Sequence, residues 1–528
     1  MIQKVLQRGL TRLLASGEKT KVSKCLSENV AHLHQALGVD DNFDVITREL
    51  KIAGKEAVLL FVDGLCRDEI LVYLLWVLFG IPREELLPLT LAKIVKERLP
   101  YAEIQTLDAL EDIVDTVLAG PPVLLVDGLD QGIVIDARIY PARSIEEPDL
   151  ERVVRGSRDG FTETLVYNTA LIRRRLRDKR LRFVVLQVGK RSKTDICLAY
   201  LEDVTNPEMV AFVRNRLEEI DIDGLPMAEK SVEELISPGS FWNPFPRVRY
   251  TERPDVAAVH LLEGHLLILV DTSPSVMIVP ATFFSHIQHA EEYRQSPFVG
   301  AYLRWVRFIA IFSSTFLLPL WLLFSLQSHL LPNFLRFIGP KEIGKIPLFG
   351  QILIAEIAVD VLRMAAIHIP SPLATALGII AAVLLGEIAI NIGLFNGEVV
   401  LYTAIAVIGS FATPSYELSM ANRLIRLGLV ILVGFWKLPG FLVGILLTFF
   451  LMASSKSFGI PYFWPLIPFN WNALKQVLIR YPVPLHNLRP SVLKPKDPVR
   501  QASPAPKPEE NKSEKKVNKV KKANNEDL

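Results

Sequence analysis

Apolar stretches long enough to cross a bilayer follow one another between Arg307 and Lys456. This run constrains the fold more than any other feature. The first expected span, Phe308 to Leu326, carries no charged residue, and roughly 20 apolar residues suffice to cross the hydrocarbon core. Residues 1 to about 298 instead have the composition of a soluble α/β segment. We therefore predict a soluble α/β N-terminal region of two lobes, followed by an all-α polytopic membrane domain.

The domain boundaries follow changes in composition. We expect a first lobe over 1–137, a second lobe with a coupling segment over 138–298, a transmembrane domain over 299–472 and a basic tail over 473–528. The end of the tail is rich in Lys, Glu, Asn and Pro and cannot bury a core, so we expect disorder after about 494. The N-terminus has no unbroken apolar core of a secretory signal. Together with the basic tail, this predicts that both soluble regions lie on the cytoplasmic side.

Three segments of the front half share one pattern, namely 58–71, 123–135 and 266–279. Each has a run of β-forming residues, then Val-Asp with a turn residue, then a second apolar run, which predicts buried strands that turn into hairpins. Asp63 and Asp127 could hold magnesium in a nucleotide-hydrolysing enzyme, but the chain has no phosphate-binding loop of the P-loop type. We expect these Asp residues to close turns, and we expect no cofactor.

Neither a metal site nor a catalytic centre is expected. His286 and His289 stand one turn apart before two glutamates, but the HExxH arrangement of zinc hydrolases is absent. We expect residues 273–297 to form an interfacial amphipathic helix that couples the soluble half to the bilayer. The three cysteines lack metal-ligand spacing and suit a reducing compartment. Basic and acidic residues nearly balance, and no segment resembles a nucleic-acid-reading surface. We therefore predict neither an enzyme nor a nucleic-acid partner.

A basic cluster ends the expected helix from Phe161 to Lys179. Arg173, Arg174, Arg175 and Arg177 lie where cations suit the helix dipole. They predict either a site for phosphate or anionic headgroups, or a solvated or subunit-facing helix end.

The second apolar stretch, Pro347 to Pro370, keeps three ionised residues. Glu356 and Asp360 are four residues apart, and Arg363 follows three later, so all three project from one face of a helix. The helix is expected to cross the bilayer or to lie partly along its interface. A structural interpretation pairs Arg363 with Asp360 or Glu356 inside a sealed bundle. A functional one places one of the acids along a cation-favouring aqueous path.

The third stretch, Leu373 to Phe395, carries Glu387 and Asn391 one turn apart. They lie beside a row of small residues that lets helices approach closely in lipid: Ala374, Gly378, Ala382 and Gly386. Glu387 has no basic residue within a turn, which favours a role for Glu387 and Asn391 in lining the path.

The end of the membrane region allows more than one topology. The stretch 399–412 is short for a span. Residues from Leu427 to Ser454 are interrupted by Lys437 and Pro439, which predicts either one kinked crossing or a pair of short helices. Placing the tail on the side of the front domain requires an even number of crossings.

Three long motifs, at 153–176, 271–297 and 412–427, resemble the A-subunit family of bacterial spore germinant receptors. The resemblance covers about residues 30–500. The HAEEYRQSP segment at 289–297 and the closing segment at 484–490 most resemble one branch of that family. The family implies the inner spore membrane, a cytoplasmic two-lobed N-terminal region, and several copies around a central ion path. The branch implies a small membrane partner and amplification of ion release.

We therefore predict a subunit of an oligomeric ion channel that releases monovalent cations during spore germination and amplifies the response. The expected partners are further copies of the chain, a small membrane partner protein or other germination receptor subunits, and membrane lipid. One alternative is a nutrient germinant receptor A subunit proper. A monomeric secondary transporter is another, although the two similar membrane halves typical of transporters are not evident. A nonconducting assembly scaffold is the third.

Overall fold

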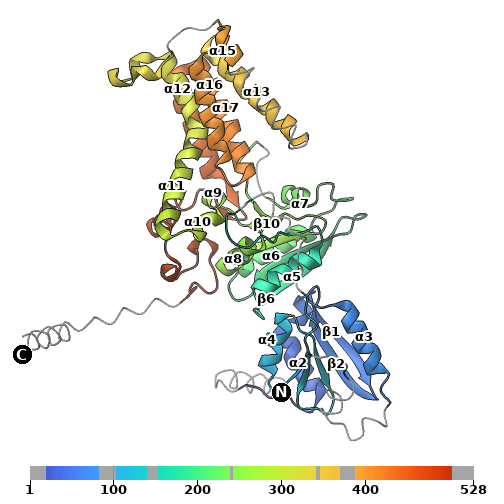
Figure 1. The fold of residues 1–528 in the computed structure, drawn as a ribbon. Coiled ribbons are helices and arrows are strands. Elements are labelled where there is room, and N and C mark those ends of the chain that lie inside the picture. The colour runs from blue at the N-terminus through green and yellow to red at the C-terminus, as the bar shows by residue number, and fades with distance from the viewer. Residues whose placement is uncertain are drawn as a thin grey trace, which may run out of the picture.

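The computed structural model describes residues 19–82, 99, 103–139, 151, 153–237, 242–340, 345–368 and 387–501. Two α/β lobes follow one another and lead into an elongated bundle of helices (Figure 1). The α/β region followed by membrane helices is the predicted fold class.

The first lobe is a five-stranded antiparallel sheet covered by helices on both faces. Its strand order is β1-β2-β4-β5-β3. Alternate residues of β2 enter two separate cores. Ala57 and Leu59 face the core built on α3, whereas Val58, Leu60 and Val62 face the core built on α2 and α4. Burial on both faces explains the continuous apolar run of this strand. The elements are α2 (Leu26–Leu37), β1 (Val45–Ile52), β2 (Lys55–Val62), α3 (Asp68–Phe79), β3 (Ile104–Leu107), α4 (Leu110–Ala119), β4 (Val123–Val126) and β5 (Gly132–Ile135).

The second lobe repeats the topology of the first. Its strand order, β6-β7-β9-β10-β8, is the same when the strands are numbered within the lobe, and every pairing is again antiparallel. Helices α5 and α8 cover one face, and α6 and α7 cover the other. The elements are α5 (Leu165–Arg175), β6 (Leu181–Val188), β7 (Thr194–Leu201), α6 (Pro207–Glu218), α7 (Ala228–Ile236), β8 (Arg249–Thr251), α8 (Pro254–Glu263), β9 (Leu266–Val270) and β10 (Val276–Val279).

Two of the three expected hairpins are present, β4–β5 and β9–β10. The hairpin expected over 58–71 is wrong, because β2 leads through a short turn into helix α3 and pairs with β4 on its other edge. Asp63 closes that turn as expected, since its Oδ1 accepts a hydrogen bond from the Gly64 amide at 2.9 Å.

Asp127 and Asp271 occupy equivalent positions in the two lobes and share a role that the turn motif did not predict. Asp127 Oδ1 accepts from the amide of Leu26, the first residue of α2, at 3.4 Å. Asp271 Oδ1 accepts from the amide of Leu165, the first residue of α5, at 3.0 Å. Each carboxylate thus stabilises the positive end of a helix in its own lobe.

A buried ion pair joins the lobes. Arg173 on α5 donates from Nε to Asp44 Oδ2 at 3.0 Å and from Nη2 to Asp44 Oδ1 at 2.9 Å. The two side chains are 0% and 1% exposed. The Arg173 guanidinium also lies 4.8 Å from the centre of the Phe183 ring. The expectation that the whole arginine cluster faces solvent or a ligand is therefore wrong for Arg173.

The coupling segment forms two short helices, not the single helix expected over 273–297. Strand β10 ends at Val279, and α9 (Phe283–Ile287) and α10 (Ala290–Arg294) follow. A capping box between Thr282 and Ser285 begins α9. The chain then enters α11 (Pro297–Phe312), which continues through a π-helical turn (Ser313–Leu317) into α12 (Leu318–Leu326). The turn lies just before Pro319, which has no backbone N–H to donate, and the wider turn accommodates the missing hydrogen bond.

Among the described residues, two helical segments are long and apolar enough to cross a membrane, Pro297–Leu326 and Tyr416–Ser454. The second is α17, and a break at Lys437 (φ 51°) divides it into two arms. A Cβ on Gly440 would clash with the backbone oxygen of Leu432, and one on Gly444 would clash with Leu429. The two arms therefore run antiparallel and in contact, so the alternative of paired helices is the one the structure adopts.

The other helices in the described part of the bundle are α13 (Leu348–His368), α15 (Ala389–Asn391) and α16 (Gly397–Phe411). Helix α13 runs antiparallel to the first arm of α17, because Phe349 packs on Phe435 near one end and Arg363 reaches Met420 near the other. Helix α13 therefore extends along the bundle. We call the end of the bundle beside the soluble lobes the proximal end, and the other end the distal end.

The chain after α17 returns to the soluble lobes. Ser457 Oγ accepts from the Ala281 amide at 2.9 Å, and the Lys496 amide donates to Val204 O at 2.9 Å. The segment includes β11 (Lys456–Ser457), β12 (Ile460–Pro461) and α18 (Trp471–Leu478). Both soluble regions thus lie at the proximal end. Packing continues to Arg500, which lies 3.4 Å from Glu263, so order extends past the expected limit near 494. Residues 502–528 lie outside the described part.

Candidate functional site

Glu356 lies at the centre of a buried charged cluster between membrane helices. It projects from α13 and is 2% exposed. Arg426, on the first arm of α17, donates from Nη2 to Glu356 Oε2 at 2.7 Å and from Nη1 to the backbone oxygen of Ser314 at 2.5 Å. One arginine therefore fastens three parts of the bundle together: α13, α17 and the π-helical turn.

Asp360, one turn further along α13, pairs with a second arginine. Arg423 Nη2 contacts Asp360 Oδ1, and the same nitrogen donates to the backbone oxygen of Glu356 at 3.3 Å. Arg423 Nε lies 4.0 Å from Glu356 Oε2. Asp360 is the more open partner, because 40% of its side chain is exposed against 5% for Arg423.

Arg363 does not pair with Glu356 or Asp360, so the pairing expected from the sequence is wrong. Its guanidinium lies 3.2 Å from Met420 Sδ and 3.4 Å from Ser410 Oγ, and 5.4 Å from the centre of the Phe411 ring. The carboxylates find their cations on another helix instead. Residues three or four apart on one α-helix can form an ion pair. Glu356 and Asp360 instead face α17, and the arginines of that helix contact them.

Sequence reasoning missed Arg423 and Arg426 as members of this cluster. They stand three residues apart just before the long apolar stretch that begins at Leu427. Two arginines on one face, opposite two carboxylates on one face of another apolar helix, were the available signal.

A cavity of about 270 Å³ adjoins the cluster, between α13 and the first arm of α17. Its lining combines charged residues with apolar ones: Glu356, Asp360, Arg363, Met364, Tyr416, Met420, Arg423, Leu424 and Leu427.

Glu387 and Asn391 lie at the distal end of the bundle and not at mid-depth. Both are exposed in the single chain. The Lys345 amide, just before α13, donates to Gly393 O at 3.3 Å, and Gln351 Nε2 donates to Asn396 Oδ1 at 2.9 Å. The structure therefore does not bring them beside Glu356 and Asp360. The small-residue row from Ala374 to Gly386, part of the expected third span, lies outside the described residues.

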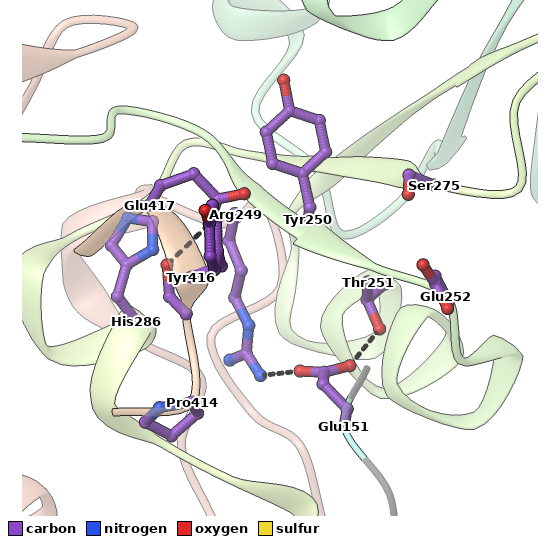
Figure 2. Close-up of a pocket in the computed structure, with 11 residues that line it drawn as sticks. Glu151, Arg249, Tyr250, Thr251, Glu252, Ser275, His286, Pro414, Tyr416 and Glu417 are labelled. Atoms are coloured by element: carbon purple, nitrogen blue, oxygen red, sulfur yellow. Dashed lines mark hydrogen bonds and ion pairs between the residues drawn. The ribbon is translucent and has the colours of Figure 1, made fainter. Parts of the chain in front are cut away.

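A small pocket marks the junction between the second lobe and the membrane helices (Figure 2). The edge strand β8, helix α9 and the loop that starts α17 meet there. Arg249 Nη2 donates to Glu151 Oε1 at 3.0 Å, and Thr251 Oγ1 donates to Glu151 Oε2 at 2.6 Å. From the membrane side, Ser415 Oγ donates to Glu417 Oε2 at 2.8 Å and caps α17. The loop between α16 and α17 is therefore seated on the soluble lobe.

Buried histidines surround Arg249. Burial, with a smaller contribution from the nearby Arg249 cation, lowers the pKa of His286 to about 3 and that of His265 to about 4. His260 stacks edge-on against His265 and has its pKa lowered for the same reasons. These rings are neutral at ordinary pH. Within the described residues, no group of three or more His, Cys, Asp or Glu side chains could hold a metal ion.

A second charged contact ties the coupling segment to the first membrane helix. Glu292 on α10 is fully buried and accepts a hydrogen bond from Arg304 Nε at 2.7 Å, and it also contacts Arg307. Arg304 Nη1 donates to the backbone oxygens of Gln476 and Val477, each at 2.9 Å. The coupling segment is thus joined to α11 and α18 through buried charge-assisted bonds.

The family model for the Bacillus/Clostridium GerA spore germination protein matches residues 31–492. The chain belongs to this family. It is 50% identical to stage V sporulation protein AF of Bacillus subtilis (strain 168) over 484 residues, which covers 92% of this chain and 98% of that protein. The resemblance read from the motifs is confirmed, and stage V sporulation protein AF represents the branch they indicated. The chain is therefore a non-enzymatic protein of spore germination.

More distant relatives include spore germination protein KA of the same organism, 30% identical over 91% of this chain and 89% of that protein. The membrane protein YfkQ, also from B. subtilis, is 28% identical over 90% of this chain and 92% of its own length. A crystal structure of the N-terminal domain of the A subunit of the Bacillus megaterium spore germinant receptor GerK3 matches with 26% identity and a TM-score of 0.38. It covers 50% of this chain and 98% of that domain. Like YfkQ, this chain is a membrane protein, and its long apolar helices agree with that.

Proposed function

We propose that the chain is a membrane subunit of an oligomeric ion channel that releases monovalent cations during spore germination and amplifies the germination response. The carrying observation is the exposed Glu387 carboxylate at the distal end of the bundle, with Asn391 one turn away. Burying a carboxylate in lipid is costly, so an ionised group at the end of a membrane bundle needs hydration or a partner. Several copies around one axis would turn it into a ring of carboxylates that concentrates cations at a pore mouth.

The charged cluster supports a structural part in the same channel. Glu356 and Asp360 are each paired with an arginine of α17, so their charge is balanced locally. Their contribution is to hold α13 against α17 while Glu387 faces outward. Of the sequence-derived pore candidates, we therefore assign Glu387 and Asn391 to the ion path, and we assign Glu356, Asp360 and Arg363 to the wall behind it.

The soluble lobes are proposed to lie in the cytoplasm, with the membrane helices in the inner membrane of the spore. The proposed partners are further copies of the chain and a small membrane protein or other germination receptor subunits. Two contacts support coupling between the lobes and the helices: the seated α16–α17 loop and the Glu292–Arg304 bond.

The test of the residue assignment replaces Glu387 by Ala in spores that carry this chain. We expect slower release of potassium or sodium during germination at unchanged protein level, measured by flame photometry of the medium. Glu398→Gln is the matched control, because Glu398 is an acid in the first turn of α16 at the same distal end. Equal ion release by wild type and Glu387→Ala would remove Glu387 from the path.

The test of the channel itself combines the mass of the detergent-purified complex with conductance in planar bilayers. A ring-sized complex with a cation-selective current is expected. A monomer with saturable solute uptake would assign the chain to secondary transport instead. A ring-sized complex without current under any trigger would make it a scaffold, and a current gated directly by a bound nutrient would make it a germinant receptor A subunit proper.

A further inference from the structure

The cavity between α13 and the first arm of α17 opens on the outer surface of the bundle. Three residues of its lining are widely exposed in the single chain: Met364 at 57%, Leu424 at 58% and Tyr416 at 49%. It lies toward the proximal end, because Tyr416 is the first residue of α17 and Arg363 is five residues before the end of α13 at His368. At about 1.5 Å per helical residue, Arg363 is roughly 8 Å from that end. The cavity therefore belongs to the half of the bundle that lies nearer the soluble lobes.

The charged cluster beside the cavity has one more arginine than carboxylates. It holds Arg363, Arg423 and Arg426 against Glu356 and Asp360; Arg426 is not part of the cavity lining, which itself carries two charges of each sign. Arg363 is the cation left over, because its contacts in the described part of the chain are a thioether, a hydroxyl and an aromatic ring. One unit of positive charge is therefore uncompensated beside a largely apolar opening.

Arg423 adds a second, independent indication. Its side chain is 5% exposed and lines the cavity, yet the buried Nη1 has no hydrogen-bond partner among the described residues. A buried guanidinium N–H without an acceptor is costly, and native structures rarely leave one. An anion in the cavity would supply the counter-charge of Arg363, and a shift of the Arg423 side chain would bring its Nη1, which has no accessible surface in this conformation, to the same anion.

The rest of the lining suits an acyl chain. Met364, Met420, Leu424 and Leu427 give the cavity a mainly apolar wall. A ligand that fits must therefore carry a negative, oxygen-rich group at one end and hydrocarbon at the other. Arginine matches phosphate geometry through its planar fork of donors, and basic pockets between membrane helices hold lipid headgroups.

We infer that this cavity binds the phosphate of an anionic phospholipid from the leaflet on the side of the soluble lobes. Arg363 and Arg423 donate to the phosphate, and the acyl chain lies along Leu424 and Leu427. The site is separate from the proposed ion path at the distal end. Binding there would fix the spacing of α13 and α17 at the level of the loop that meets the second lobe.

The experiment is native mass spectrometry of the full-length chain in detergent with added phosphatidylglycerol or phosphatidylcholine. We expect a retained phosphatidylglycerol adduct on the wild type, and roughly tenfold weaker retention by Arg363→Gln, because one charge-assisted contact is lost. Arg363→Lys should recover part of the retention. Lys345→Gln is the matched control, because it removes the same charge at the distal end, where Lys345 Nζ lies 3.4 Å from Ile392 O; its retention should equal that of the wild type.

Three outcomes would overturn the inference. Equal retention by wild type and Arg363→Gln would show that the lipid binds elsewhere. Equal retention of phosphatidylcholine and phosphatidylglycerol would remove the role of the anion. Displacement of the lipid by millimolar inorganic phosphate would assign the site to a free anion. The readout is lipid binding, so failure of the channel proposal would leave it unaffected.

Discussion

Replacing Arg173 by Met should destabilise the soluble region more than any surface change. The substitution keeps an apolar stem but leaves the Asp44 carboxylate, 1% exposed, without the two guanidinium donors at 2.9 and 3.0 Å. Removing one partner of such a buried pair costs about 3–5 kcal/mol. At about 2–4 °C per kcal/mol for a region of this size, the melting temperature should fall by roughly 6–20 °C.

The assay is differential scanning calorimetry of the full chain in detergent, read at the transition of the soluble lobes. Arg174→Met is the control, because Arg174 is the exposed neighbour on the same helix, and it should melt within about 2 °C of the wild type. The double variant Asp44→Asn with Arg173→Met should recover much of the loss, since it leaves no isolated charge. An unchanged transition in Arg173→Met, or a double variant as unstable as the single one, would refute a buried pair between the lobes.

Two further predictions concern pH and the helical hairpin. His286 and His265 are neutral when folded, with pKa values of about 3 and about 4, against about 6.5 when unfolded. Below pH 6.5 the unfolded chain therefore binds more protons than the folded chain. The free energy of unfolding decreases as the pH is lowered, and at pH 5.5 it is about 1.4 kcal/mol smaller per histidine than at pH 7.5. Denaturant titration at pH 7.5 and 5.5 should show a smaller loss for His286→Phe than for the wild type, and equal losses would contradict the buried neutral ring. Gly440→Ala should prevent close contact of the two arms of α17, because the added Cβ would meet the Leu432 backbone oxygen. Gly428→Ala is the control, because a Cβ at Gly428 meets open space. In detergent, Gly440→Ala should melt at a lower temperature than Gly428→Ala, and equal melting temperatures would mean that the arms are not in contact.

Hydrophobic patterning was sufficient to predict the major division of the chain. Long runs of apolar side chains are stable only inside a bilayer or a buried core. The change of composition near residue 300 therefore indicated where the soluble part ends. The patterning also indicated five of the ten strands described in the lobes, namely β2, β4, β5, β9 and β10. The pattern could not show that the second lobe repeats the first, because the repeat is one of strand order and is carried by pairings between segments far apart in the chain.

Partner choice in the charged cluster depends on tertiary structure. Glu356, Asp360 and Arg363 share one helix face, and the sequence alone favoured pairing among them. In the folded chain, α13 lies antiparallel to α17, so Arg423 and Arg426 approach the two carboxylates and Arg363 is displaced toward Met420. Similarly, Arg173 is one of four clustered arginines in the sequence, and only the docking of the two lobes buries it against Asp44.

The amino-acid sequence by itself determined the family and the order of environments along the chain: a soluble α/β region, then membrane helices, then a polar end. These follow from local composition and from motifs, which depend on neighbours along the chain. The tertiary structure decided which charges meet, that α17 folds back at Lys437, and that Glu387 lies at the distal end away from Glu356. These depend on which residues far apart in the chain are brought together, because hydrogen bonds and steric contacts form only at distances of about 3–4 Å.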